Sequence, residues 1–514
     1  MTRPLSAWAA ERPDGLAVAG ERGTRTFAEL DRAANRVARA LRTHGVGAGD
    51  GVALLCGNRP EFAEVYFACQ RAGLRLTPIN WHLSADEVAY IVEDCEASAL
   101  VADAAVAEHD VAAHAGSRNR AVLAVGGALP GSIEYESAVA AHDAGPLEDA
   151  AAGSTMLYTS GTTGRPKGVY RRTPPSTALA NVNLGGYAED GGDVHLCTGP
   201  LYHAAPLAFS LAVPISWGAT VVVMDSFDAE RALRHIEGER VTHTHMVPTM
   251  FHRLLSLPEE TRTRTDVSSL RHVLHGAAPC PVSVKRRMLE WVGPIVWEYY
   301  AATEGVGSFV DPATWLAHPG TVGRPITPDQ VRIGDESGNP LPVGETGLIF
   351  LRAPREGRFS YFKDDAKTRD TYRGEYFTLG DVGHLDEEGF LFLTDRTANV
   401  IISGGDNNYP AEVDAVLLHH PAVADAATIG VPDEEWGESV LAVVELQRGV
   451  GATDALATEL VAHCRARIAH YKCPRAVAFV DALPRQDNGK VYKGVLRDRF
   501  RAAAVPAPTG SIAP

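Results

Sequence analysis

Residues 27–45 read FAELDRAANRVARALRTHG, and they are followed by GVALLCGN at residues 51–58 and EFAEVYFACQRAGL at residues 61–74. The first and third segments carry apolar residues at helical spacing, and the first ends at Gly45, a residue suited to a helix C-terminus. The second segment is a short apolar run, which is typical of a buried strand. The stretch therefore predicts a helix–strand–helix unit of an α/β fold.

Similar apolar runs recur along the chain and predict further buried strands. They are ASALVAD at residues 97–103, GATVVVMD at 218–225, THTHMVP at 242–248, HVLHGAA at 272–278 and PIVWEYY at 294–300. Apolar strands that alternate with helices indicate parallel sheets covered by helices. Ligands of such sheets bind beyond the carboxyl ends of the strands, so we expect the functional loops there.

The pattern changes in the last third of the chain. Residues 331–352, VRIGDESGNPLPVGETGLIFLR, contain two hairpin-like turns and predict a small antiparallel β element. We expect a large N-terminal domain at residues 1–396, made of layered α/β subdomains plus this β element. A small α+β C-terminal domain is expected at residues 397–500. The Ala- and Pro-rich tail, residues 501–514, is predicted to be disordered.

Length and composition restrict the class of protein. The 514 residues exceed one compact core, in agreement with two or more domains, and the formal net charge is −16. This charge disfavours nucleic acid as a partner, because a phosphate backbone requires a basic surface, but it allows a small anion held by a few local cations. No apolar run of about 18 residues and no secretory signal is apparent, so no integral membrane segment is expected.

The seven cysteines include no C-x-x-C pair, which favours reduced thiols and a cytoplasmic protein over a zinc site or a disulfide framework. The sequence leaves a monomer and a homodimer equally open.

Residues 158–169 read YTSGTTGRPKGV, a segment too polar and too rich in glycine to pack a core. Its glycines allow successive backbone N–H groups to bind an anion, and its hydroxyl groups and Lys167 add donors and a positive charge. The segment is not a Walker A loop, because Pro166 precedes the lysine and Gly168 follows it. Loops of this composition are also typical of solvent-exposed turns. Taken alone, the segment leaves both interpretations open.

Seven further motifs follow this loop along the chain. They are PLYHAAP at 200–206, HGAAP at 275–279, YYAATEG at 299–305, FTLGD at 377–381, TDR at 394–396, SGGDNNYPAEVD at 403–414 and PRQDNGKVYK at 484–493. In composition, order and spacing the eight motifs resemble the adenylate-forming superfamily, which includes acyl-CoA synthetases, luciferases and nonribosomal adenylation domains. The resemblance extends over roughly residues 10–500.

The resemblance implies a nucleotide site. The residues that it assigns to this site are Thr159, Ser160, Gly161, Thr162, Thr163, Gly164, Lys167, Gly276, Ala277, Ala278, Tyr299, Tyr300, Asp381 and Arg396. Asp381 and Arg396 would bind the ribose, and Tyr300 would lie on the adenine face. Without the resemblance, Asp381 would be interpreted as an ordinary turn aspartate and Arg396 as a surface cation.

The resemblance also implies catalytic residues, which are Lys490, Thr303, Glu304 and His203. Lys490 would contact the substrate carboxylate and the α-phosphate, where negative charge accumulates during the reaction. Thr303 would donate to the α-phosphate, and Glu304 would be the Mg²⁺ ligand, since this ion prefers hard oxygen donors. His203 would lie beside the entrance to the acyl pocket. Alternatively, Glu304 is a carboxylate at a helix N-terminus, favoured by the helix dipole, and Lys490 is a solvated lysine in an exposed turn.

The acid would be held by side chains at residues 203–217, 243–251 and 275–281. His243 and His245 alternate and would share one face of a strand. No third ligand is apparent in the sequence, so we interpret them as a strand end near the acid-binding region rather than as a metal pair.

The reaction implied has two half-reactions, with ATP, Mg²⁺ and coenzyme A. A carboxylic acid and ATP give an acyl-adenylate and pyrophosphate, and the coenzyme A thiol then displaces AMP. The C-terminal domain would rotate between the steps, presenting Lys490 first and the loop of Gly404 and Gly405 second. PLYHAAP, HGAAPCP and EYYAATEGVG most resemble the fatty-acid and steroid side-chain branch. We therefore expect a small-molecule acid that is apolar, from medium or long fatty acids to bulky ring-bearing acids.

Two alternatives to this reaction are considered. In the first, the adenylate passes to an acceptor other than coenzyme A, and in the second, no adenylate is formed. Asp406 adds negative charge and Asn408 a polar side chain beside the thiol-delivery loop, and coenzyme A is polyanionic. A carrier-protein thiol, an amine or another nucleophile is therefore an alternative acceptor. A non-catalytic nucleotide-binding protein is disfavoured, because Lys490, Glu304 and Asp381 are all present.

Overall fold

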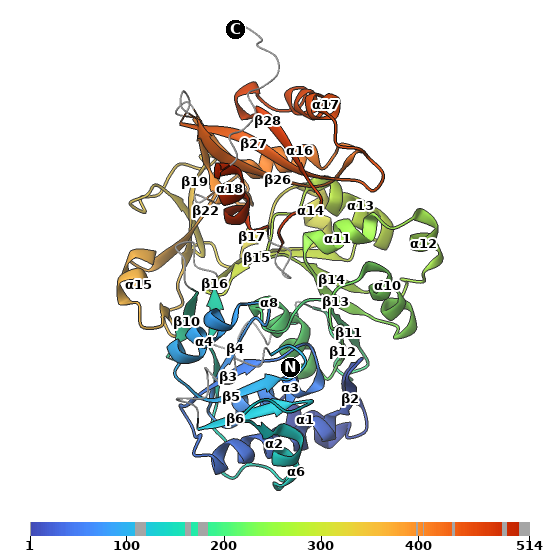
Figure 1. Cartoon of the computed structure of the whole chain (residues 1–514), viewed down its shortest axis with the longest axis vertical. Coiled ribbons are helices and arrows are strands. Elements are labelled where there is room, and N and C mark those ends of the chain that lie inside the picture. Colours follow the sequence, from blue (N-terminus) through green and yellow to red (C-terminus); the bar gives the residue numbers. More distant parts are fainter. Residues whose placement is uncertain are drawn as a thin grey trace.

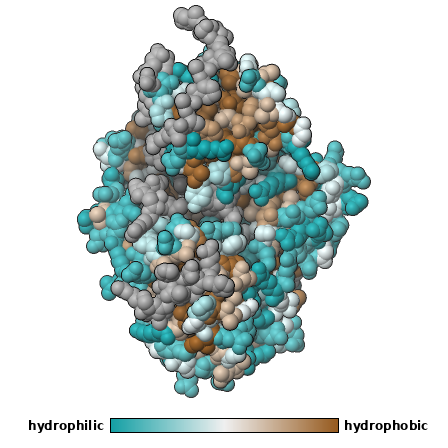
Figure 2. Space-filling model, viewed as in Figure 1, coloured by the Kyte–Doolittle hydropathy of each residue, from teal (hydrophilic) through white to brown (hydrophobic). Residues whose placement is uncertain are grey.

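The computed structural model describes residues 2–107, 120–159, 166–172, 183, 185–396, 399–403, 406–433, 437–485 and 491–502. In Figure 1 the C-terminal strands and helices, drawn in orange and red, lie at one end of the long axis of the molecule. Hydrophilic side chains cover most of the face shown in Figure 2. None of the helices in these ranges has the length and apolar character needed to cross a membrane.

The largest sheet has nine strands in the order β17-β16-β15-β14-β13-β11-β12-β1-β2. Its strands are β1 (Leu16–Gly20), β2 (Gly23–Thr26), β11 (Val194–Cys197), β12 (Thr220–Val223), β13 (His243–Met246), β14 (His272–His275), β15 (Val296–Ala302), β16 (Gly305–Val310) and β17 (Arg324–Pro325). The strands from β1 to β15 in this order run parallel, as predicted. Strands β2, β16 and β17 pair antiparallel at the two ends.

A second sheet, with six strands in the order β7-β6-β5-β3-β4-β8, is parallel throughout. Its strands are β3 (Gly51–Leu55), β4 (Arg75–Pro78), β5 (Ala97–Asp103), β6 (Ala121–Val125), β7 (Ile133–Glu134) and β8 (Ser154–Thr155). One apolar core joins the two sheets: Leu41 and Phe62 from helices pack with Val52 of β3 and Val221 of β12. The predicted layered α/β architecture is thus confirmed.

Helices connect and cover the strands of both sheets. They are α1 (Leu5–Glu11), α2 (Phe27–Thr43), α3 (Pro60–Arg71), α4 (Ala85–Asp94), α6 (Tyr135–Ala140), α8 (Ala204–Leu207), the π-helix η1 (Ala208–Ala212), α9 (Val213–Ser216), α10 (Ala229–Gly238), α11 (Pro248–Leu255), α12 (Glu259–Arg264), α13 (Val282–Val292) and α14 (Pro312–Ala317). The predicted helix over residues 27–45 is α2. It begins with a capping box between Thr26 and Glu29, and it is followed by Gly45 at a φ of +75°.

Two antiparallel sheets follow the parallel ones. Strands β9 (Leu157–Thr159), β10 (Lys167–Arg171) and β20 (Phe359–Tyr361) form the smaller. The other contains β18 (Val331–Gly334), β19 (Gly347–Arg352), β21 (Tyr372–Arg373), β22 (Tyr376–Leu385) and β23 (Leu391–Arg396), and α15 (Asp365–Thr371) connects the two. Strands β18 and β19 pair antiparallel, which confirms the β element predicted over residues 331–352.

The C-terminal elements form their own sheet and core. They are β24 (Ile401–Ser403), β25 (Asp406–Asn408), α16 (Pro410–Leu417), β26 (Val423–Asp433), β27 (Gly437–Leu446), α17 (Asp454–Arg465), the 3-10 helix η3 (His470–Lys472), β28 (Ala476–Val480) and α18 (Lys493–Ala502). The boundary at residue 396 remains a prediction, and residues 503–514 of the predicted tail lie outside the described residues.

Two contacts fix this C-terminal unit against the N-terminal one. The Ala411 N–H at the start of α16 donates to Asp395 Oδ2 of β23 at 2.9 Å. His252 of α11 is packed against the start of β26, since burial lowers the pKa of its imidazole while the Ala424 backbone and the Asp425 carboxylate act in the opposite direction. The C-terminal unit thus lies beside β23 and α11.

Candidate active site

Strands β9 and β10 hold the two ends of the glycine- and threonine-rich loop. They pair antiparallel with Thr159 opposite Lys167. The intervening predicted ligands Ser160, Gly161, Thr162, Thr163 and Gly164 lie outside the described residues. Lys167 Nζ donates to Asp364 Oδ2 at 2.6 Å, and this bond is the main reason that the pKa of the Asp364 carboxyl is lowered. A cation is therefore fixed at the base of the loop, and its role as a phosphate ligand remains a prediction.

Thr303 and Glu304 lie in the turn between β15 and β16. The Arg171 guanidinium donates to both of their carbonyl oxygens, at 3.0 and 2.7 Å, and Tyr361 Oη donates to Glu304 Oε1 at 3.0 Å. Glu304 is buried. Both the backbone and the carboxylate of Glu304 are thus held in place by side chains from two neighbouring strands.

The Glu304 carboxylate has the donor chemistry of a magnesium ligand. The described part of the chain contains no group of three or more acidic, histidine or cysteine side chains arranged to hold a metal ion. Protein Mg²⁺ sites commonly use one or two carboxylates and complete the octahedron with substrate phosphates and water. One buried carboxylate beside a nucleotide site therefore fits Mg²⁺ delivered with ATP.

The segment Gly276–Ala278 follows β14 and approaches β15 closely. A Cβ atom at Gly276 would lie 2.6 Å from the Tyr299 carbonyl oxygen, so only glycine fits at this position. Ala277 has a φ of +67°, an unusual conformation for a residue with a side chain. The predicted adenine neighbour Tyr300 donates its hydroxyl to Asp381 Oδ2 at 2.7 Å. These predicted nucleotide residues are thus brought together on two adjoining sheets.

The two predicted ribose ligands face each other. Asp381 of β22 stands opposite Arg396 of β23 in the antiparallel register. The side chain of Arg396 and the residues Gly404, Gly405 and Lys490 lie outside the described residues. The ribose and catalytic roles assigned to these residues remain predictions.

The residues that flank Lys490 in the sequence are described. Arg485 and Val491 pair in an antiparallel bridge. The Arg485 guanidinium donates from two nitrogens to the Asp425 carboxylate, both at 2.6 Å. Asp425 and Arg485 both act on His252 of α11 electrostatically. The segment that carries Lys490 is therefore anchored where the C-terminal unit meets the N-terminal one.

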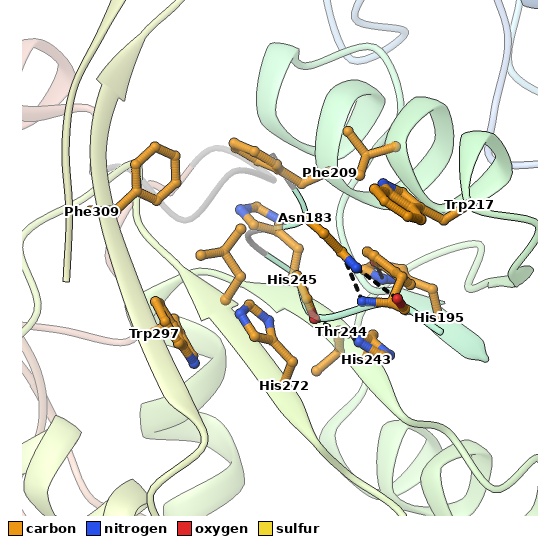
Figure 3. A pocket seen from close by; sticks show the side chains of 14 residues that line it. Asn183, His195, Phe209, Trp217, His243, Thr244, His245, His272, Trp297 and Phe309 are labelled. Carbon is orange, nitrogen blue, oxygen red and sulfur yellow. Dashed lines mark hydrogen bonds between the residues drawn. The ribbon is translucent and has the colours of Figure 1, made fainter. Parts of the chain in front are cut away.

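A cavity of about 60 Å³ opens between the nine-stranded sheet and the helical segment η1–α9. Its lining residues are Asn183, Gly185, Tyr187, His195, Phe209, Val213, Trp217, His243, Thr244, His245, His272, Leu274, Trp297 and Phe309. Figure 3 shows Phe309 and Trp297 on one side, Phe209 and Trp217 on the other, and the histidines between them. Phe209 lies in the π-helix η1, a distortion that is frequent at functional sites.

The predicted acid-binding segments contribute to this cavity in part. Residues from 203–217 and 243–251 line it, whereas no residue of 275–281 occurs in its described lining, and the role of these segments in binding the acid remains a prediction. His203 is the N-cap residue of α8, and it is not one of the described residues that line the cavity. His243 and His245 share the face of β13 that forms the cavity. The prediction missed His195 and His272, which lie on β11 and β14, the two strands on either side of β13.

Burial keeps three imidazoles of this region neutral. It lowers the pKa of His243 to about 4 and that of His245 to about 3, and it lowers the pKa of His195 well below its usual range. At neutral pH these three imidazoles are thus uncharged, and aromatic rings surround them in the lining of the cavity.

The free energy of unfolding is expected to fall as the pH is lowered from 6.5 towards 4. The folded-state pKa of His243 is below the unfolded value of about 6.5, so only the unfolded chain takes up this proton in that window. Each such proton contributes a slope of about 1.4 kcal/mol per pH unit. In the variant His243→Phe, the slope of the free energy of unfolding against pH should be smaller by about 1.4 kcal/mol per pH unit. Urea unfolding followed by circular dichroism at several pH values measures this slope. His470→Asn, at an exposed position, is the control; an unchanged slope in His243→Phe would contradict the assignment.

Known proteins resemble this chain over nearly its whole length. Residues 5–358 match the family described as AMP-binding enzyme, and residues 412–490 match the AMP-binding enzyme C-terminal domain. A feruloyl-CoA synthase from an Amycolatopsis species is 36% identical over 96% of this chain and 99% of its own. An indoleacetate–CoA ligase from Aromatoleum aromaticum is 33% identical over 92% of each chain. The structure of o-succinylbenzoate CoA synthetase from Bacillus subtilis with its acyl-adenylate intermediate has a TM-score of 0.80 and 31% identity, over 98% of each chain.

Proposed function

The chain belongs to the AMP-binding enzyme family and is an AMP-forming acid–CoA ligase, and from this premise we propose that its acid is apolar and carries an aromatic ring. The acid would react with ATP to give an acyl-adenylate and pyrophosphate, and coenzyme A would then displace AMP. The observation that carries the proposal is the lining of the cavity, in which flat rings predominate.

The rings around the cavity are arranged to contact one edge of another ring. Trp217 and Phe209 come from the helical side, and Trp297 and Phe309 from the strands. Aromatic side chains favour offset or edge contacts with a further ring, each worth about 0.5–1.5 kcal/mol beyond burial. A flexible fatty chain gains no such contacts. The relatives named for ferulate and indoleacetate, which are ring-bearing acids, support the same choice over the fatty-acid branch.

The predicted site residues would have different roles in the first step. Lys167, Thr159 and the loop between them would hold the phosphates, and Asp381 with Arg396 the ribose. Mg²⁺ on Glu304 would neutralise phosphate charge when bound. One carboxylate oxygen of the acid attacks the α-phosphorus and the bond to pyrophosphate breaks, so that pyrophosphate leaves and the mixed anhydride stays bound. Lys490 would offset the charge on the acid and the α-phosphate during this attack.

The second step consumes the mixed anhydride. The coenzyme A sulfur attacks the acyl carbon, and the bond from that carbon to the AMP oxygen breaks, so that AMP leaves as an anion. A cleft closed to water protects the anhydride until the thiol arrives. We propose that the C-terminal domain, residues 397–500, turns between the steps and brings Gly404 and Gly405 to the site, while His203 borders the acyl entrance.

A panel of acids tests the substrate class. We expect kcat/KM, measured by pyrophosphate release with ATP and coenzyme A, to be at least about tenfold higher for arylpropenoic and arylacetic acids than for fatty acids of equal carbon number. The fatty acids are the matched controls, because they have the same carboxylate and a similar apolar content. A preference for octanoate or decanoate over every aryl acid would contradict the proposal.

A further inference from the structure

Three histidines form a row across neighbouring strands at the bottom of the cavity. His195 of β11 pairs with His243 of β13, and His243 pairs with His272 of β14, so all three project from one face. Stacked rings extend this row: the centroid separations are 4.1 Å from Tyr187 to His243, 5.9 Å from His243 to His272 and 5.3 Å from His272 to Trp297. A wall of stacked rings therefore closes this end.

Several polar groups of the lining are already committed to the protein. His243 Nε2–H donates to the Gly185 carbonyl oxygen at 2.8 Å. The Asn183 side chain forms two hydrogen bonds with the backbone of Tyr187. Its amide nitrogen donates to the Tyr187 carbonyl oxygen at 2.7 Å, and its amide oxygen accepts from the Tyr187 N–H at 2.9 Å. His245 Nε2 is 3.0 Å from the Tyr299 hydroxyl. None of these groups needs a ligand to complete its hydrogen bonding.

His195 differs from these groups. The Tyr187 hydroxyl lies 2.7 Å from His195 Nδ1, which is its only hydrogen-bond partner among the described residues, so the hydroxyl donates to Nδ1. The neutral imidazole must then carry its own proton on Nε2. His195 is only 2% exposed, and its Nε2 has no hydrogen-bond partner within the described part of the chain. A buried donor without a partner destabilises the protein, so an acceptor on a ligand at this site would be favoured.

The acceptor that suits this donor is uncharged. No Asp, Glu, Lys or Arg side chain occurs among the described residues that line the cavity. The carboxylate of Asp193 lies close to the row, since its Oδ1 is 3.8 Å from His243 Nδ1, and Arg271 pairs with it. An anion at His195 would be buried without a cation and close to this carboxylate, which is strongly unfavourable.

Size and position indicate which part of an acid would reach His195. About 60 Å³ accommodates a substituent or one edge of a ring rather than a complete ring acid. From His272 to Gly276 the chain rises about 13 Å along β14 and its continuation, at about 3.3 Å for each residue. The carboxylate of the acid would lie at the nucleotide site. Its far end would thus reach the cavity only if a linker separates the ring from the carboxylate.

Resting on the function proposed above, we propose that His195 Nε2–H recognises an uncharged oxygen at the far end of a ring-bearing acid. The oxygen is that of a hydroxyl, ether or ketone group, and acids with a second carboxylate in this position are rejected. His195 is a specificity-determining residue for the acid, and the row of histidines is the inner end of its binding site.

Substituted cinnamic acids test this proposal, because methyl and hydroxyl groups have similar size. We expect kcat/KM for pyrophosphate release to be about tenfold higher for 4-hydroxycinnamate than for 4-methylcinnamate, and lowest for 4-carboxycinnamate. In His195→Leu the hydroxyl-to-methyl ratio should fall to about one or below, whereas His195→Gln, which retains an N–H donor, should keep a ratio above one. His420→Leu, at a buried histidine of the C-terminal domain, is the control and should leave the ratio unchanged.

Each ratio is measured within one variant, so a general loss of folding does not alter it. A wild-type ratio of one or less, or a ratio unchanged in His195→Leu, overturns the role of His195 and leaves the proposed function standing. Faster turnover of 4-carboxycinnamate than of 4-methylcinnamate also overturns it. If unsubstituted cinnamate and all its derivatives are inert while fatty acids react, the proposed function fails and this inference fails with it.

Discussion

Replacing Lys490 by alanine is expected to slow acyl-adenylate formation by about a thousandfold. A charge contact at about 4 Å in a protein site is worth about 4 kcal/mol, and a thousandfold change in rate corresponds to a similar free energy. The lysine would act where two anions, the carboxylate and the α-phosphate, must approach each other. The second half-reaction contains no such encounter. Thioester formation from a supplied acyl-adenylate should therefore change by no more than a few-fold.

The two half-reactions can be measured separately. Pyrophosphate release from acid and ATP reports the first, and AMP release from synthetic acyl-adenylate and coenzyme A reports the second. Lys472→Ala is a matched control, because Lys472 lies in the same domain and pairs with Glu412 at 2.6 Å. It should leave both rates within a few-fold. Equal losses in both half-reactions of Lys490→Ala would mean that the lysine has no specific part in adenylation.

Replacing Glu304 by glutamine is expected to reduce adenylation by about a hundredfold and to raise the Mg²⁺ concentration needed for half-maximal rate. The amide has the shape of the carboxylate and can still accept from Tyr361, so the change removes mainly the charge that a Mg²⁺ ligand supplies. Loss of one charged ligand contact is worth several kcal/mol when phosphate charge must be neutralised.

Tyr361→Phe provides the matched control for Glu304→Gln. It removes the hydrogen bond to Glu304 Oε1 and leaves the charge in place. A hydrogen bond to a charged group contributes about 1.5–3 kcal/mol, so its loss should slow adenylation by between about tenfold and about a hundredfold, and it should not alter the Mg²⁺ requirement as strongly. Titrating the initial rate with Mg²⁺ at fixed ATP separates the two variants. An unchanged Mg²⁺ requirement in Glu304→Gln would remove this residue from the metal site.

The parts of the fold that local pattern determines were predictable. Helix α2 follows from its apolar spacing and from Gly45, and the parallel strands follow from short apolar runs between helices. The pairing of Thr159 with Lys167 agrees with a loop that leaves one strand and enters another. Motif resemblance, rather than pattern, led to Thr303, Glu304 and Asp381.

Features that depend on long-range pairing were not predictable. Strand β11 lies between β12 and β13, so the alignment of His195 with His243 requires the sheet order, which no local pattern contains. The ion pair between Lys167 and Asp364 joins residues 197 positions apart. The π-helix at Ala208–Ala212, which presents Phe209 to the cavity, has no signal in a segment of small apolar residues.

Product analysis distinguishes coenzyme A from other acceptors of the acyl group. The purified protein is incubated with Mg²⁺, ATP and an arylpropenoic acid, with and without coenzyme A, and the products are separated and identified by mass spectrometry. We expect AMP, pyrophosphate and an acyl-CoA in equal amounts when coenzyme A is present, and only enzyme-bound acyl-adenylate with pyrophosphate when it is absent. AMP and pyrophosphate without any acyl-CoA, in the presence of coenzyme A, would refute the ligase function and assign the acyl group to another acceptor, such as an amine or a carrier-protein thiol.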